Sequence, residues 1–243
     1  MNKQIINHLF EFWEQIGKHG NFLTKENGFS FTNPSDNSWP SKIFHFNISE
    51  LELSELQKKI RLQELPNSLA IHEDNVIKNE LVRNGFCPTS QVKAMALDTS
   101  EFNFVPIDAS EFIRVRSRLE AELFAQVATE SFGYPVDPST IRALINKPSF
   151  ALFLGKHENA FPSCGMVYLD QNGVSGIHMI GTKAGYRGLG LGKKMTQFLI
   201  HQAIKNQSRK VYLVASQAGE RIYTKMGFTT HGVLESYSLP LNL

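Results

Sequence analysis

The stretch of sequence that decides the fold spans residues 181–194 and reads GTKAGYRGLGLGKK. It follows a strand-like run, Val174–Thr182, and it precedes a helical pattern of apolar residues. Glycines let a backbone approach a ligand closely, and the free N–H groups at a helix N-terminus favour a phosphate. Arg187, Lys193 and Lys194 add positive charge at the same place. The stretch therefore predicts a pyrophosphate-binding loop that opens a helix.

Other glycine-loop motifs fit this stretch poorly. A Walker loop would need Gly and Ser or Thr where the chain has Arg187 and Lys194. A dinucleotide fingerprint that starts at Gly188 would need glycine at Lys193. These mismatches disfavour an ATP-binding or NAD-binding loop. A structural turn with solvated lysines is the remaining alternative.

The sequence after residue 100 alternates strand and helix patterns, which predicts a mixed α/β domain. The turn residues Asp170-Gln171-Asn172-Gly173 predict a hairpin between two of the strands. The expected strands are Phe102–Ile107, Phe150–Lys156, Cys164–Asp170, Val174–Thr182, Lys210–Ala215 and Phe228–Tyr237, and the expected helices are Ser110–Ser131, Asp137–Asn146, the segment from the glycine loop to about Asn206, and Gln217–Met226.

The first hundred residues begin with helical spacing and then contain a weaker copy of this pattern. A strand (Ser68–His72), a helix (Asp74–Asn84) and a strand (Val92–Leu97) repeat the order found after Lys210. Aligning the two Gly-Phe pairs places Leu81 opposite Tyr223. We expect two parts, residues 1–98 and 101–243, with chance similarity as the alternative to a true repeat.

Three segments of the second part carry a resemblance to a known family. Arg187–Gly192 fits the pattern Arg/Gln-x-x-Gly-x-Gly/Ala, and Gly176–Thr182 precedes it as a strand. Ala215–Phe228 follows and closes on Tyr-x-x-x-Gly-Phe. In this order and spacing the segments resemble the GNAT family, the Gcn5-related N-acetyltransferases. The resemblance implies an α/β fold (α+β in some schemes) over 101–243, with a mixed, mostly antiparallel sheet, a splayed fourth strand and flanking helices. It also implies that 1–98 is a smaller, degenerate GNAT-like unit, as in tandem members.

The same resemblance implies an acyl-CoA donor, most simply acetyl-CoA, with other acyl-CoA molecules possible. Its pyrophosphate would lie on the backbone N–H groups of the glycine loop, and its pantetheine would run along the fourth strand. The acyl carbonyl would lie near the N–H of Ile180, and Ser216 would either bond the pantetheine or cap a helix. The residues implied to bind the donor are Met179, Ile180, Gly181, Thr182, Arg187, Gly188, Leu189, Gly190, Leu191, Gly192, Lys193, Ser216 and Tyr223. We expect this to be the one CoA site of the chain.

Tyr223 is the expected general acid, because a phenol stays protonated at neutral pH and can assist the departing thiolate. Packing in the core is the alternative for this side chain. Some family members place a glutamate base on the fourth strand, whereas Val174–Thr182 has no carboxylate and offers His178. As alternatives, His178 is a buried core residue, and the base is a water relayed to the backbone or to a group of the first part. Because neither Cys87 nor Cys164 looks like a poised nucleophile, we expect direct attack by the amine.

Composition and charge limit the classes of partner that this protein is expected to bind. The 243 residues carry 25 Lys and Arg against 23 Asp and Glu, which argues against a dedicated nucleic-acid binder. No apolar run approaches a membrane span, no secretory signal is recognisable, and no Cys or His spacing predicts a metal site. We therefore expect a cytoplasmic acetyltransferase acting on a small-molecule or peptide amine, with the acceptor and the oligomeric state open. A CoA-binding sensor or interaction module without turnover is the alternative. Phe10, Phe12, Trp13 and Trp39 are candidates for an acceptor cleft, although core packing is the favoured interpretation.

Overall fold

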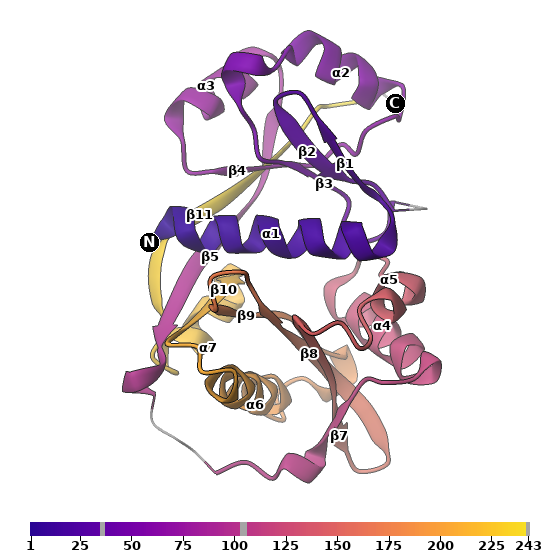
Figure 1. The fold of residues 1–243 in the computed structure, drawn as a ribbon, viewed down its shortest axis with the longest axis vertical. Helices are drawn as coiled ribbons and strands as arrows, with labels where there is room; N and C mark the ends of the chain where they lie inside the picture. The colour runs from indigo at the N-terminus through magenta and orange to yellow at the C-terminus, as the bar shows by residue number, and fades with distance from the viewer. Residues whose placement is uncertain (35–36, 103–105, 242–243) are drawn as a thin grey trace.

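The computed structural model describes residues 1–34, 37–102 and 106–241. One 11-stranded sheet runs through these residues in the order β1-β2-β3-β4-β11-β5-β10-β9-β8-β7-β6 (Figure 1). The strands are β1 (Leu23–Glu26), β2 (Phe29–Thr32), β3 (Lys42–Phe44), β4 (Leu69–His72), β5 (Cys87–Asp98), β6 (Phe112–Arg114), β7 (Phe150–His157), β8 (Ala160–Leu169), β9 (Ser175–Thr182), β10 (Lys210–Ala215) and β11 (Thr229–Ser238). Most neighbours are antiparallel, whereas the β3–β4 and β9–β10 pairs are parallel.

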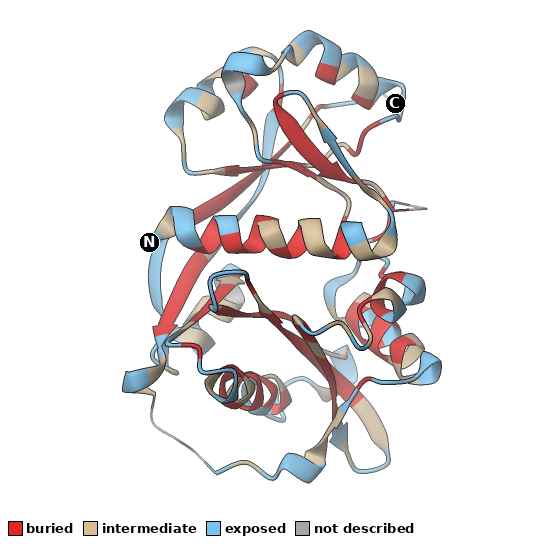
Figure 2. Ribbon diagram, in the orientation of Figure 1, coloured by how far each residue is buried: buried red, intermediate tan, exposed pale blue. Residues whose placement is uncertain are grey.

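Helices cover both faces of this sheet. They are α1 (Asn2–Gly20), α2 (Leu53–Arg61), α3 (Asn75–Arg83), α4 (Arg118–Phe132), α5 (Pro138–Ala143), α6 (Leu191–Lys205) and α7 (Gln217–Thr224). One core cluster joins α1, α4 and α5 to the sheet, and a second joins α6 to it. A third lies among α2, α3 and the strands β2, β3, β4 and β11. Figure 1 shows α1 crossing the middle of the molecule, and Figure 2 shows many of its residues buried.

Two strands are exchanged between the parts predicted from the sequence. β11 pairs with β4 and β5 along one stretch of sheet, and β5 pairs in turn with β10. Each part therefore contributes a strand to the other's portion of the sheet. The order β4–α3–β5 matches the order β10–α7–β11, and this correspondence is consistent with the predicted repeat. The division at residues 98–101 stays a prediction, and the sheet is continuous across it.

The sequence placed most elements of the second part within a few residues. The hairpin turn is present, because the N–H of Gly173 donates to the carbonyl of Asp170 at 3.1 Å. The helix predicted from Ser110 is wrong at its start, where 112–114 form β6 instead. Ser117 begins α4 with a capping box, in which its hydroxyl accepts from the N–H of Glu120. The strand predicted over Phe102–Ile107 falls partly on 103–105, outside the described residues, and its described ends are not in a strand.

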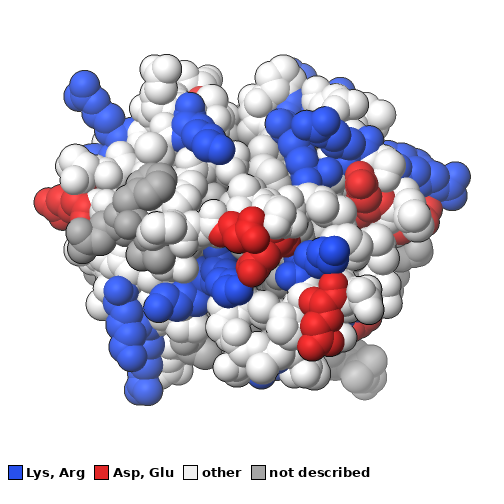
Figure 3. Space-filling model, turned by 90° about the horizontal axis from the view of Figure 1, so that it is seen from below, with Lys and Arg blue, Asp and Glu red and all other residues white. Residues whose placement is uncertain are grey.

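None of the described helices has the length and apolar character needed to cross a membrane. Viewed from below, the surface carries Lys and Arg side chains interspersed with Asp and Glu (Figure 3). The described residues on that face therefore form a mixed surface rather than one continuous basic stripe of the kind that tracks a nucleic-acid backbone.

Candidate functional site

The strands β9 and β10 separate in the middle of the sheet. Their pairing is limited to Ser175 with Val211 and Gly176 with Tyr212, at the start of β9. Further along, a register shift against β8 accompanies a left-handed backbone at Met179, with φ of 53°. Such a bulge bends the strand and disrupts its ladder locally. The fourth strand of the second part is thus splayed from its neighbour, as predicted.

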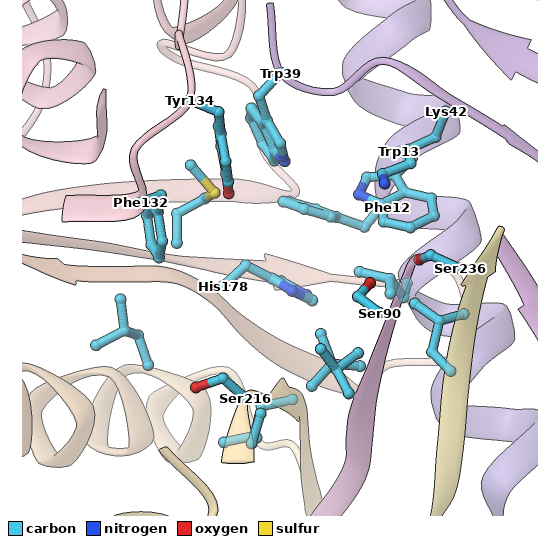
Figure 4. Close-up of a pocket in the computed structure, with 18 of the residues that line it drawn as sticks. Phe12, Trp13, Trp39, Lys42, Ser90, Phe132, Tyr134, His178, Ser216 and Ser236 are labelled. Atoms are coloured by element: carbon cyan, nitrogen blue, oxygen red, sulfur yellow. The ribbon is translucent and has the colours of Figure 1, made fainter. Parts of the chain in front are cut away.

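A cavity of about 540 Å³ lies at this opening and is bounded by both parts of the chain. Phe12 and Trp13 reach it from α1, and Trp39 comes from the segment before β3 (Figure 4). Phe132 and Tyr134 line it from the end of α4, with their rings stacked at 5.5 Å. The cavity is therefore largely aromatic. Three of the four aromatic residues proposed for a cleft line it, whereas Phe10 packs in the core.

Lys42 is the one Lys, Arg, Asp or Glu side chain among the described residues that line this cavity. Its ammonium group donates a hydrogen bond to the hydroxyl of Ser68. Burial lowers the pKa of Lys42 below its usual value. Ser90 and Ser236 add hydroxyl groups from β5 and β11. The lining thus combines apolar walls with a few polar groups, which is typical of a small-molecule site.

Tyr223 of α7 lines the cavity and packs edge-on against Phe228, with ring centroids 5.9 Å apart. Burial raises the pKa of Tyr223 to about 12, and a hydrogen bond with Thr196 opposes part of that rise. The phenol is therefore protonated throughout the neutral range. Leu81 occupies the corresponding position on α3, where it is 1% exposed and lies in the core.

His178 of β9 also lines the cavity, with Phe12 stacked on it at a centroid distance of 3.9 Å (Figure 4). Its Nε2 lies 3.4 Å from Nε2 of His8, which belongs to α1. The Nδ1 of His8 is in turn 3.0 Å from the carboxylate of Asp170. Burial holds the pKa of His178 well below its usual value. The sequence analysis missed His8 and Asp170 as neighbours of His178.

The glycine loop ends at Gly190, which has φ of 75° and precedes α6 without a side-chain cap. The first N–H groups of α6 are therefore left for another partner. Arg187 donates to the backbone carbonyl of Ser131, and Lys194 forms an ion pair with Glu111 at 3.0 Å. No described residue forms an ion pair with Lys193. The loop thus presents backbone donors beside an exposed cation.

The structure divides the predicted donor-binding residues into two groups. Met179, Ile180, Ser216 and Tyr223 line the cavity together with His178, whereas Gly181, Thr182 and 187–193 do not. Ser216 caps α7, because its hydroxyl accepts from the N–H of Gly219 at 3.2 Å. Its predicted contact with pantetheine stays a prediction.

The two cysteines differ in environment. Cys164 is fully buried, and burial raises the pKa of its thiol to about 12, whereas Cys87 is exposed. Neither cysteine lines the cavity. No group of three or more His, Cys, Asp or Glu side chains in the described ranges is placed to hold a metal ion.

Comparisons with known proteins agree with this architecture. A sequence model of the acetyltransferase (GNAT) family matches residues 120–228. No protein with curated annotation matches the chain. A GCN5-related N-acetyltransferase from Kribbella flavida is similar in fold, with a TM-score of 0.72 at 17% identity over 94% of each chain.

Two further solved structures share the fold at low sequence identity. A GCN5-related N-acetyltransferase from Sphaerobacter thermophilus has a TM-score of 0.61 at 12% identity, covering 95% of this chain and 87% of that one. A GNAT-family acetyltransferase from Novosphingobium aromaticivorans reaches 0.61 at 9% identity, over 93% and 94%. Residues 120–228 therefore match the acetyltransferase (GNAT) family in sequence, and the chain shares the fold of these GNAT structures, including the splayed strand.

Proposed function

We propose that this protein transfers an acyl group from an acyl-CoA, most simply acetyl-CoA, to a primary amine. The observation that carries the proposal is the cavity beside the splayed β9, which Tyr223 and His178 line together. A proton donor and a proton acceptor in one cavity are what attack by an amine on a thioester requires. The donor supplies an activated acyl thioester when it is bound.

The residues around the opening suit an acyl-CoA. Because β9 and β10 stop pairing after Gly176, the free edge of β9 offers backbone groups that the pantetheine amides can pair with. At the end of β9, the uncapped start of α6 suits the pyrophosphate, as do the left-handed glycines Gly188 and Gly190. Lys193 adds a cation there without a described carboxylate partner.

In this proposal Tyr223 donates a hydrogen bond to the departing thiolate, and His178 accepts a proton from the amine. The raised pKa of Tyr223 keeps its hydroxyl proton in place at neutral pH. The lowered pKa of His178 keeps its imidazole neutral, which is the state that can accept a proton. Both cysteines lie outside the cavity, so the amine attacks the thioester directly.

The aromatic lining also favours a class of acceptor. Trp13, Trp39, Phe132 and Tyr134 provide flat apolar surfaces near the histidine. An amine attached to an apolar or aromatic body would bury those surfaces on binding, which is favourable by about 25 cal/mol per Å². Small amines with an apolar or aromatic body are therefore better candidate acceptors than polyamines.

Release of free CoA thiol tests the proposal directly. The protein is incubated with acetyl-CoA and a panel of amines, amino acids and peptides, and each product is identified by its mass. The proposal requires amine-dependent thiol release with an acetylated amine as product. A protein that binds acetyl-CoA but acetylates no amine in the panel is the outcome expected of a sensor, and it would refute the transferase function.

A further inference from the structure

A row of buried polar side chains leads from the cavity into the core behind His178. His8 and Asp170 follow in that order, at 3.4 Å between the histidine Nε2 atoms and 3.0 Å between Nδ1 and the carboxylate. The side chains of His8 and Asp170 are 1% and 5% exposed. Buried ionisable groups are costly unless they are paired, so a row of three at one site calls for a reason beyond packing.

The fold brings the two histidines together at a specific point. His8 and Phe12 lie one turn apart on α1, so both face β9, and both rings lie nearly parallel to the ring of His178. Between the histidines lies Gly176, where an added Cβ would collide with Nε2 of both rings. A glycine at this position is therefore what allows the two imidazoles to approach each other.

The carboxylate at the end of the row is firmly held. Asp170 begins the turn between β8 and β9, and its second oxygen accepts from the N–H groups of Asn172 and Val174 at 2.9 and 2.8 Å. Burial raises the pKa of Asp170, but the hydrogen bonds from His8 and from the backbone outweigh it and bring the pKa below its usual value. Asp170 is consequently an ionised acceptor at neutral pH.

This arrangement fixes where the protons are. An ionised carboxylate can only accept, so Nδ1 of His8 carries a proton. When His8 is neutral its Nε2 has a lone pair, and Nε2 of His178 must then carry the proton between them. The lone pair of His178 is left on Nδ1, which no described residue hydrogen-bonds and which is not a fully buried atom. That nitrogen is the one able to accept a proton at the cavity.

We propose that His8 and Asp170 are positioning residues that hold His178 in this tautomer and receive the positive charge that the reaction generates. The inference rests on the proposed acyl transfer. The new amide N–C bond forms as the C–S bond of the thioester breaks, and CoA leaves as its thiolate. The amine proton moves to Nδ1 of His178, and the Nε2 proton of His178 moves to Nε2 of His8. His178 ends neutral, and His8 becomes an imidazolium paired with the carboxylate of Asp170.

This two-step proton transfer, the relay, moves the positive charge from His178 at the cavity wall to His8 beside the carboxylate of Asp170. Burial makes His178 a poor place for a lasting positive charge, whereas His8 lies against a carboxylate. Among the described residues, the titratable groups that face His8 besides Asp170 and His178 are Tyr168 of β8 and Tyr212 of β10. The hydroxyl of Tyr168 is bonded to Glu11 of α1. Both tyrosines have a raised pKa through burial, so they stay neutral and Asp170 is the negative charge in contact with His8.

The first test reads the tautomers in the wild-type protein without turnover. Long-range ¹H–¹⁵N correlation spectra of protein with ¹⁵N-labelled histidine report which ring nitrogens are protonated. We expect the proton of His178 to lie on Nε2, facing a lone pair on Nε2 of His8, and the proton of His8 to lie on Nδ1, facing Asp170. A resting imidazolium at His8, with the proton of His178 on Nδ1, would overturn the inference, because His178 would then have no lone pair facing the amine.

The second test is the variant Asp170→Asn, with Asp137→Asn as its control. In both residues the carboxylate accepts from the N–H two positions later, but Asp137 caps α5 away from the cavity. Without the carboxylate we expect kcat to fall by about 10²-fold or more, at the lower end of the effect of a positioned base. The acid limb of kcat should move to lower pH, because an imidazolium without a carboxylate has a lower pKa. Calorimetric affinity for acetyl-CoA should stay the same.

These outcomes separate the relay from the acyl transfer itself. An active Asp170→Asn variant with the wild-type kcat and the wild-type acid limb would refute the relay and leave the transferase function standing. A wild-type protein that acetylates no amine would refute the transferase function. If Asp170→Asn does not fold, the tautomers of the wild-type protein decide the question alone.

Discussion

Replacing Tyr223 with phenylalanine tests the role of its hydroxyl and leaves its packing intact. The ring contact with Phe228 is preserved, and the bond with Thr196 is lost, which costs about 0.5–1.5 kcal/mol of stability. Since the pKa of Tyr223 is about 12, full proton transfer to a thiolate with a pKa near 8.5 is uphill. The hydroxyl therefore acts mainly as a hydrogen-bond donor to a developing charge.

A hydrogen bond to a charged group contributes about 1.5–3 kcal/mol, so we expect kcat of Tyr223→Phe to fall roughly 10- to 150-fold. The assay is thiol release at saturating acetyl-CoA and amine, with affinity for acetyl-CoA measured in parallel by calorimetry. The ratio of wild-type to variant kcat should be constant from about pH 6 to 9, because the phenol does not titrate there.

Tyr237→Phe is the matched control for this variant. Tyr237 is also buried, its pKa is likewise raised to about 12, and it lies outside the cavity lining. We expect its kcat to equal that of the wild type. A Tyr223→Phe variant with wild-type kcat would show that this tyrosine is a packing residue, as Leu81 is in the first part.

Three further predictions follow from the site and its supporting helices. The double variant Cys87→Ala with Cys164→Ala should keep its activity, and intact-mass measurement during turnover should find no acetylated protein; loss of activity together with a trapped acetyl-enzyme in the wild type would contradict direct attack. Trp39→Ala should raise the KM for the amine roughly tenfold, because removing one large apolar contact costs about 1.5 kcal/mol or more. The Kd for acetyl-CoA should stay the same. A raised Kd for acetyl-CoA with an unchanged KM for the amine would place Trp39 on the donor side. Asp137→Ala should lower the free energy of unfolding by about 1 kcal/mol at neutral pH, because it removes the cap of α5. The pKa of Asp137 is lowered by its side-chain and backbone hydrogen bonds with Ser139, so its contribution is present above about pH 4 and is lost as pH falls through the folded-state pKa. Urea unfolding at neutral pH and at about pH 3 should therefore show the difference from wild type shrinking, and a constant difference would refute this account.

Local sequence patterns were sufficient to predict most strands and helices of the second part. The glycine loop before α6 and the segment Ala215–Phe228, which contains Tyr223, each have their signal within one strand and one helix. The exchange of β5 and β11 has no such signal. Either strand would satisfy the same alternation beside either neighbour, so only long-range pairing decides which part it joins.

The row behind His178 could not be predicted for a similar reason. His8 and Asp170 are separated by 162 positions in the chain, and His8 occupies one position on the apolar face of an ordinary amphipathic helix. One error was avoidable. The spacing from Ser110 suited a helix, but Ser117 followed three residues later by Glu120 is the signature of a capping box, and it marks where α4 begins.

The central claim is that acyl-CoA binds at the glycine loop before α6. Its most direct test is a calorimetric titration of acetyl-CoA into the wild-type protein and into the variant Gly192→Leu. Gly192 lies in the first turn of α6, where an added Cβ would meet Thr182 at an ordinary 3.5 Å, so the variant should fold. A larger side chain there should block the approach of the pyrophosphate to the helix N-terminus. We predict one equivalent bound by the wild type and none by the variant. Absence of binding in the wild type, two equivalents per chain, or undiminished binding in Gly192→Leu would contradict the assignment of the CoA site.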